Sequence, residues 1–124
     1  ALQNKAITVY KPGSQLRNVL YVTDAVDALL AAALSDKSAG ETFFAVGDEH
    51  YSVKEIAEKT CDAMGGIVQM IDWPKDRKAI EIGDAVISNT KIKSTLGWKP
   101  KVGFEEGLKL TYDYFQNKLD HYLN

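Results

Sequence analysis

Residues 15–24 run from a polar loop through a short β-branched and aromatic stretch to an aspartate that opens a helical pattern. Arg17 stands in the loop part of this run. Its guanidinium is a rigid fork of donors that matches phosphate geometry better than any other side chain. An arginine anchored between a strand and a helix is therefore a candidate holder of a diphosphate. The alternative from the residue type alone is an ordinary surface arginine.

Apolar runs typical of strands alternate with stretches of helical spacing along the chain. The expected strands cover residues 5–10, 19–22, 42–47 and 67–72. The expected helices cover residues 24–34, 53–64 and 88–96, and a last helix begins near residue 104. This alternation predicts an α/β fold. No repeat or linker divides the sequence, so residues 1–124 are predicted to form a single domain.

Local signals refine these elements. Asp24 is the expected N-cap of its helix. The residues that follow it at helical spacing form one apolar stripe, made of Val26, Leu29, Leu30, Ala33 and Leu34. Ser52 and Glu55 fit a capping box. Residues 42–47 are apolar without alternation, which predicts a strand buried on both faces.

Composition excludes several classes of function. The formal net charge of −2 provides no overall attraction to nucleic acid. No apolar run approaches the roughly 20 residues that span a bilayer, so we expect no membrane association. Cys61 is the only cysteine, which indicates a reducing compartment and a cytoplasmic protein. His50 and His121 lie far apart without ligands at suitable spacing, so no metal site is expected.

Four groups of segments, in register along nearly the whole chain, resemble one protein family. They are residues 15–17 with 21–24, residues 40–41 and 44–47 with 52–57, residues 82–84 with 91 and 96–100, and residues 104–108. Together they resemble the C-terminal, substrate-binding part of the extended short-chain dehydrogenases/reductases, the NAD-dependent epimerases and dehydratases of nucleotide sugars. The resemblance implies that the chain forms the family's α+β substrate-binding lobe and lacks the Rossmann lobe. The opening Ala-Leu-Gln, without a Met, is also what we expect from the middle of a longer protein, and removal of a tag would give the same start.

The resemblance assigns roles to individual residues. It implies that Arg17 contacts the diphosphate of a nucleotide sugar, that Thr8 and Tyr10 lie against the base, and that Asp84 lies near the ligand. Many members carry a second phosphate-binding arginine where Glu81 stands here, and Arg77 (or its neighbour Lys78) is the candidate replacement.

The resemblance also indicates what this chain does not carry. The sequence has no glycine-rich G-x-x-G-x-x-G turn, so NAD is expected on the absent lobe and no cofactor-binding residue is expected here. Tyr114 and Lys118 have the spacing of the family's acid–base pair but lack its sequence context, so no catalytic residue is assigned. The complete protein is expected to be a homodimer, and the apolar face that meets its Rossmann lobe is expected to be exposed in this chain.

The expected function is the substrate-binding portion of a nucleotide-sugar 4-epimerase or, less favoured, a 4,6-dehydratase, inactive alone. The alternative is a non-catalytic nucleotide-binding or protein-interaction module on the same scaffold. A DNA-binding function is not favoured. Residues 52–59 resemble the first helix of a helix-turn-helix motif, but the residues that follow (67–71) predict a strand rather than a basic recognition helix.

Overall fold

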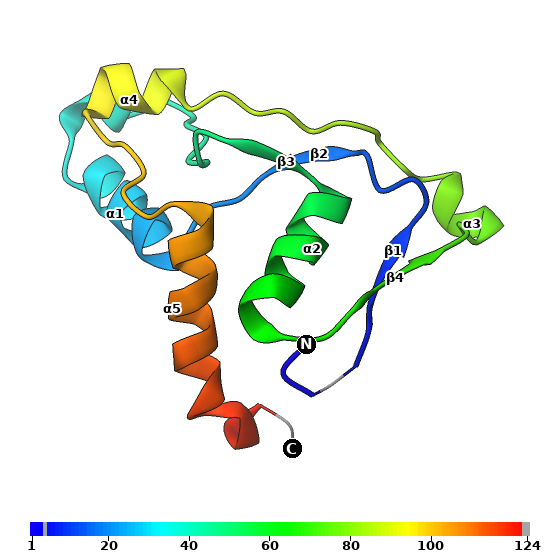
Figure 1. Ribbon diagram of the computed structural model, residues 1–124. Helices are drawn as coiled ribbons and strands as arrows, with labels where there is room; N and C mark the ends of the chain where they lie inside the picture. The colour runs from blue at the N-terminus through cyan, green and yellow to red at the C-terminus, as the bar shows by residue number, and fades with distance from the viewer. Residues whose placement is uncertain (4, 123–124) are drawn as a thin grey trace.

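The computed structural model describes residues 1–3 and 5–122, and Figure 1 shows the arrangement of their elements. Two small sheets form the centre. One pairs β1 (Ile7–Tyr10) in parallel with β4 (Val68–Ile71), and the other pairs β2 (Leu16–Asn18) antiparallel to β3 (His50–Ser52). The helices are α1 (Val22–Ala33), α2 (Val53–Met64), α3 (Lys75–Lys78), α4 (Thr90–Leu96) and α5 (Phe104–Gln116), with 3-10 turns at Asp36–Ser38 and Leu119–His121. The mixed α/β class predicted from the sequence is confirmed.

The start of α2 confirms the predicted capping box. The Ser52 hydroxyl accepts the backbone N–H of Glu55 at 3.1 Å, and the Glu55 carboxylate accepts the backbone N–H of Ser52 at 2.8 Å. The helix then packs against β1 and α5 (Figure 1). Ala57 on α2 and Val9 on β1 are both buried, so this junction fixes the parallel sheet against the helix.

A second packing centre lies between α1 and α4. Its buried members are Ala28, Ile92 and Trp98, and partly buried side chains surround them (Leu20, Ala31, Phe43, Ala45 and Leu96). The indole N–H of Trp98 donates to the carbonyl oxygen of Asp24 at 3.1 Å, which pairs the ring's polar atom. Gly97 ends α4 in the left-handed conformation that the sequence predicts for a helix stop.

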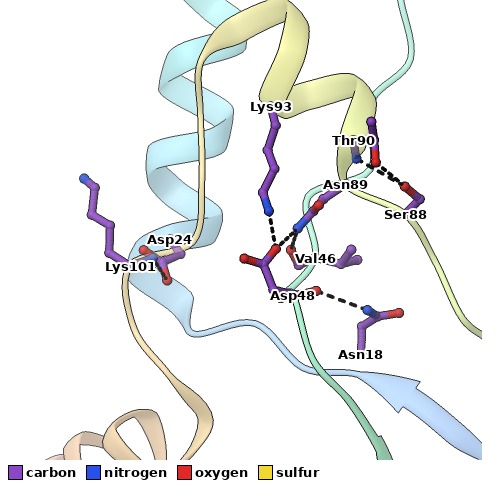
Figure 2. A network of polar contacts seen from close by, with 10 residues as sticks. Asn18, Asp24, Val46, Asp48, Ser88, Asn89, Thr90, Lys93 and Lys101 are labelled. Atoms are coloured by element: carbon purple, nitrogen blue, oxygen red, sulfur yellow. Dashed lines mark hydrogen bonds and ion pairs between the residues drawn. The ribbon is translucent and has the colours of Figure 1, made fainter.

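Asp24 corrects one sequence prediction. It lies inside the first turn of α1 rather than at the N-cap, which is Tyr21 and makes no side-chain cap. The residue is 1% exposed, and one carboxylate oxygen accepts the backbone N–H of Lys101 at 3.0 Å (Figure 2). The same oxygen accepts the backbone N–H of Val102 at 2.9 Å. A negative charge in the first turn also suits the helix dipole. Asp24 therefore ties α1 to the segment before α5.

Two predicted strands are wrong. Residues 19–22 form no strand, because the strand lies earlier, in β2, and Val22 already belongs to α1. Residues 42–47 also form no strand in the described part of the chain. Polar contacts hold this segment instead: the amide of Asn89 donates to the carbonyl oxygen of Val46 at 2.9 Å, and that of Asn18 donates to the carbonyl oxygen of Gly47 at 3.2 Å (Figure 2).

The apolar stripe of α1 lies at the surface. Leu29 is 71% exposed and Leu34 is 86% exposed, and Val26 and Leu30 are also exposed. The buried positions of the helix are Asp24 and Ala28. Within residues 1–3 and 5–122, no helix combines the length and apolar character needed to cross a bilayer.

Candidate functional site

Arg17 lies at the centre of β2, between two neighbouring segments. On one side it pairs with Tyr51 of β3, and on the other it forms an isolated parallel bridge with Ala85. The backbone N–H of Ala85 donates to the carbonyl oxygen of Leu16 at 3.0 Å. The segment that follows α3 therefore runs beside β2 (Figure 1) and extends the small sheet by one neighbour. The backbone of Arg17 is fixed from both sides.

The guanidinium of Arg17 is directed at the turn that precedes this segment. Its Nη1 donates to the carbonyl oxygens of Leu16 and Gly83, at 2.8 and 2.6 Å. Its Nη2 lies 3.3 Å from Oε1 of Glu81. The Arg17 and Glu81 side chains are 29% and 26% exposed, so the ion pair is partly withdrawn from water. The arginine is therefore held in a defined orientation and still reaches the surface.

Asp84 is brought to the same place, but its contact is with the backbone. Its Oδ1 accepts the N–H of Leu16 at 2.8 Å. The carboxylate thereby anchors the turn of residues 81–84 to β2 next to Arg17. The structure thus brings the predicted residues Arg17 and Asp84 together, with Glu81 as a third member that the sequence did not assign.

Thr8 and Tyr10 lie on the same face of β1, because alternate residues of a strand point to one side. Thr8 is exposed. The Tyr10 ring packs on Trp73, with centroids 4.5 Å apart and planes at 31°. The indole N–H of Trp73 donates to the carbonyl oxygen of Lys11 at 2.6 Å, which locks the ring beside the strand. Trp73 was missed from the sequence, although a tryptophan one residue beyond the expected strand 67–72 was a usable signal.

Arg77 lies apart from these residues. It is exposed on α3, a four-residue helix that is not among the helices expected from the sequence. Within the described residues, no hydrogen bond or ion pair joins its side chain to Arg17, Glu81 or Asp84.

The Tyr114 and Lys118 pair contacts through the aromatic ring. Nζ of Lys118 lies 4.3 Å from the centroid of the Tyr114 ring. The Tyr114 hydroxyl is 2.8 Å from that of Tyr122, and this hydrogen bond raises the pKa of Tyr122. Tyr114 lies near the C-terminal end of α5, and Lys118 lies just beyond that helix. Neither residue belongs to β2, which carries Arg17.

A hollow of about 290 Å³ opens beside β3. Its lining includes Asp48, Glu49, Tyr51, Lys101 and Phe104. Burial raises the pKa of Tyr51 to about 12, and its hydrogen bond to Glu49 acts in the same direction. The Tyr51 ring packs on Phe104 at 4.7 Å between centroids, so a neutral phenol forms this wall. No group of three or more metal-ligating side chains occurs in the described part of the chain.

Comparisons with known proteins agree with this architecture. The sequence model of the GDP-mannose 4,6 dehydratase family matches residues 1–111. The chain belongs to the extended short-chain dehydrogenase/reductase family of nucleotide-sugar epimerases and dehydratases.

The curated relatives match all or nearly all of this chain but are much longer. UDP-glucuronic acid decarboxylase 1 of Danio rerio is 34% identical over 126 residues, which cover 100% of this chain and 29% of the relative. The dTDP-glucose 4,6-dehydratase of Escherichia coli is 32% identical over 122 residues, which cover 93% of this chain and 33% of the relative. The chain thus spans about a third of the length of these curated family members.

Solved structures of the family show the same fold. The UDP-glucose 4-epimerase of Thermotoga maritima, solved with UDP-glucose, has a TM-score of 0.80 and 29% identity, covering 95% of this chain and 37% of that one. The UDP-glucose 4-epimerase of Thermus thermophilus, solved in complex with NAD, has a TM-score of 0.76 and 26% identity, covering 94% and 37%.

Proposed function

We propose that this chain is the substrate-binding portion of an NAD-dependent enzyme that acts on a nucleotide-diphosphate sugar, with a 4-epimerase favoured over a 4,6-dehydratase. The observation that carries the proposal is the placement of Arg17. In this chain, pairing in β2 fixes the backbone of Arg17, and two carbonyl oxygens fix its guanidinium. Part of the guanidinium remains at the surface. The alternative of a non-catalytic module is not favoured, because the named relatives are enzymes.

The number of N–H donors that the described residues leave free on the guanidinium supports a phosphate-binding role for Arg17. A guanidinium carries five N–H donors. Contacts within the described residues use three of them, two on Nη1 and one on Nη2. Nε and the second N–H of Nη2 lie on one edge of the planar group, which is the arrangement that a bidentate phosphate contact uses. We assign this edge to the diphosphate.

The aromatic pair on β1 supports a role in base binding. Tyr10 and Trp73 form a tilted stack whose indole is fixed by a hydrogen bond, and Thr8 lies exposed on the same strand face. Aromatic faces and a hydroxyl suit a nucleobase, so we propose that Thr8 and Tyr10 contact it. Asp84 acts beside the ligand by holding the turn at β2. We retain Arg77 as a second cation for the phosphates, reached from α3.

The reacting half of the enzyme is proposed to lie outside this chain. The sequence contains no glycine-rich phosphate cradle, so its residues do not fit NAD, which would take and return a hydride on a separate Rossmann lobe. The exposed apolar stripe of α1 is the face that this lobe would cover. The chain alone is then inactive, and we expect the complete protein to be a homodimer of the cytoplasm, in keeping with its single cysteine.

The test uses the complete protein and measures the binding of UDP, dTDP, GDP, CDP and ADP by calorimetry. Arg17→Ala should weaken the preferred diphosphate by about 10- to 150-fold, because one hydrogen bond to a charged group contributes about 1.5–3 kcal/mol. Arg17→Lys should recover part of that loss, since it restores the charge without the fork.

Lys37→Ala is the matched control, because it removes an exposed cation far along the chain from Arg17. It should leave the affinity unchanged. Arg17→Ala with an intact circular dichroism spectrum and unchanged diphosphate affinity would overturn the proposal. Assay of the complete protein with a panel of nucleotide sugars then separates epimerase from dehydratase.

A further inference from the structure

We infer that the Glu81 carboxylate competes with the ligand's phosphate for Arg17. It thereby weakens the binding of ligands that carry negative charge. This inference rests on the proposed function of Arg17. It assigns Glu81 a part in selecting the ligand, at a position where the sequence resemblance left only a missing arginine.

The contacts of Glu81 place its charge on the Arg17 group. Its Oε1 lies 3.3 Å from Nη2 of Arg17 and also accepts the backbone N–H of Gly83 at 2.9 Å. Nη1 of Arg17 is already occupied by the carbonyl oxygens of Leu16 and Gly83. Nη2 is therefore where the internal carboxylate and an incoming phosphate oxygen meet.

The local charge balance makes this competition strong. One cation, Arg17, lies among two carboxylates, because Asp84 is bound to the backbone N–H of Leu16 beside it. The three side chains together carry a formal net charge of −1. A diphosphate carries further negative charge to this place, so its attraction to Arg17 is offset by repulsion from Glu81. Because the pair is partly withdrawn from water, both the attraction to Arg17 and the repulsion from Glu81 are stronger than they would be in bulk solvent.

Both groups can contact Nη2 at once, because Glu81 uses one of its N–H groups and the phosphate oxygen uses the other. The two negative charges then repel each other across the same nitrogen atom, while the Glu81 carboxylate stays bound to the Gly83 N–H. Arg17 keeps its orientation throughout, because its two carbonyl contacts do not involve Glu81. Glu81 is then a specificity-determining residue that acts through charge, rather than one that merely orients the arginine.

Glu81→Gln separates these two roles. Glutamine keeps the length of the side chain and a carbonyl oxygen for Nη2 and for the Gly83 N–H, but it removes the negative charge. In the complete protein, Glu81→Gln should tighten binding of the preferred nucleoside diphosphate by about tenfold. The gain should be smaller for the monophosphate of the same base and absent for the nucleoside, because the repulsion scales with ligand charge.

Two further variants make the result decisive. Glu106→Gln neutralises an exposed carboxylate in the first turn of α5 and should leave diphosphate affinity unchanged. In the double variant Arg17→Ala/Glu81→Gln, the gain from Glu81→Gln should be reduced, because the two residues act on one phosphate contact.

The outcomes distinguish the two proposals. If Glu81→Gln leaves affinity unchanged or weakens it in a folded protein while Arg17→Ala weakens it, then Glu81 only orients the arginine and this inference is overturned. An equal gain for nucleoside and diphosphate would overturn it as well. If Arg17→Ala has no effect on affinity, the proposed function itself fails, whatever Glu81→Gln does.

Discussion

Asp24 and Val102 lie 78 positions apart in the sequence, yet the Asp24 carboxylate accepts the backbone N–H of Val102 at 2.9 Å. The same oxygen accepts the N–H of Lys101, so one buried side chain satisfies two backbone donors of the segment that leads into α5. Because the indole of Trp98 also donates to the Asp24 carbonyl oxygen, the first turn of α1 serves as the anchor for residues 98–102.

Removal of the Asp24 carboxylate should therefore destabilise the fold strongly. Asp24→Ala leaves two partly buried N–H groups without an acceptor and should lower the free energy of unfolding by about 2–3 kcal/mol. Asp24→Asn keeps one acceptor oxygen without the charge and should cost about 1–2 kcal/mol. Urea denaturation measures both values. Asp62→Asn, on the exposed face of α2, is the control and should unfold like the parent protein.

A comparison of Gly13 with Gly40 separates the cost of backbone strain from the cost of a steric clash. Both have φ of +74°, where an alanine costs about 1–2 kcal/mol. A Cβ at Gly13 would lie 2.8 Å from Cγ1 of Val9, whereas a Cβ at Gly40 meets nothing within 4 Å. Gly13→Ala should therefore cost about 1–3 kcal/mol more than Gly40→Ala in the same denaturation experiment. Equal losses would show that the turn at Gly13 yields without strain.

Stability should fall in acid partly through Asp48. The hydrogen bond from Lys93, followed by that from Asn89, lowers the pKa of Asp48 below its usual 3.8 (Figure 2). A carboxyl whose pKa is lowered by folding stabilises the protein above its unfolded pKa, and this contribution is lost as pH falls through the folded value. The Asp48 side chain is about half exposed, so the contribution is below about 1 kcal/mol.

Thermal unfolding from about pH 6 to about pH 3 measures this contribution. The decline in Tm should be shallower for Asp48→Asn than for the parent protein, with the difference confined to pH values below about 4. Asp62→Asn makes the same chemical change at an exposed site and should keep the parent's slope. Parallel curves for all three proteins would refute a role for Asp48.

The α1 stripe should matter in the complete protein. If the proposed Rossmann lobe covers Leu29 and Leu30, the double change of both to Lys removes about 3 kcal/mol or more of apolar burial. The complete protein should then unfold at a lower temperature. Ile67→Lys is the control, since Ile67 is about as exposed as Leu29 but lies just before β4, away from α1 in the sequence. A Tm loss no greater than that of the control would argue against this docking face.

Local sequence signals predicted the elements whose stabilising contacts are local. The Ser52 and Glu55 capping box, the glycine stop after α4 and the start of α5 at Phe104 all involve partners within a few residues. The segments predicted as β1 and β4 are also strands, although their pairing could not be inferred because it joins distant parts of the chain. The resemblance to the family was confirmed, and it came from motifs rather than from element boundaries.

The errors arose where a distant partner decides the structure. Residues 42–47 have the composition of a strand, but a strand also needs a neighbouring strand to satisfy its backbone. Here side-chain amides bind two of its carbonyl oxygens, and the Gly47 N–H donates to the carbonyl oxygen of Val19. Asp24 has the residue type of an N-cap, and the burial that gives it another role depends on residues 98–102. Contact between Glu81 and Arg17 was invisible for the same reason.

The parallel pairing of β1 with β4 has a consequence for how the chain reaches its native state. Register places Ile7 opposite Val68, so β2, α1, β3 and α2 all lie between the two strands in the sequence. Closing so long a loop costs entropy before any ladder hydrogen bond forms, so this sheet is expected to assemble late and to slow folding. Truncation of the first ten residues would strip β4 of its neighbour and leave a bare edge that invites self-association.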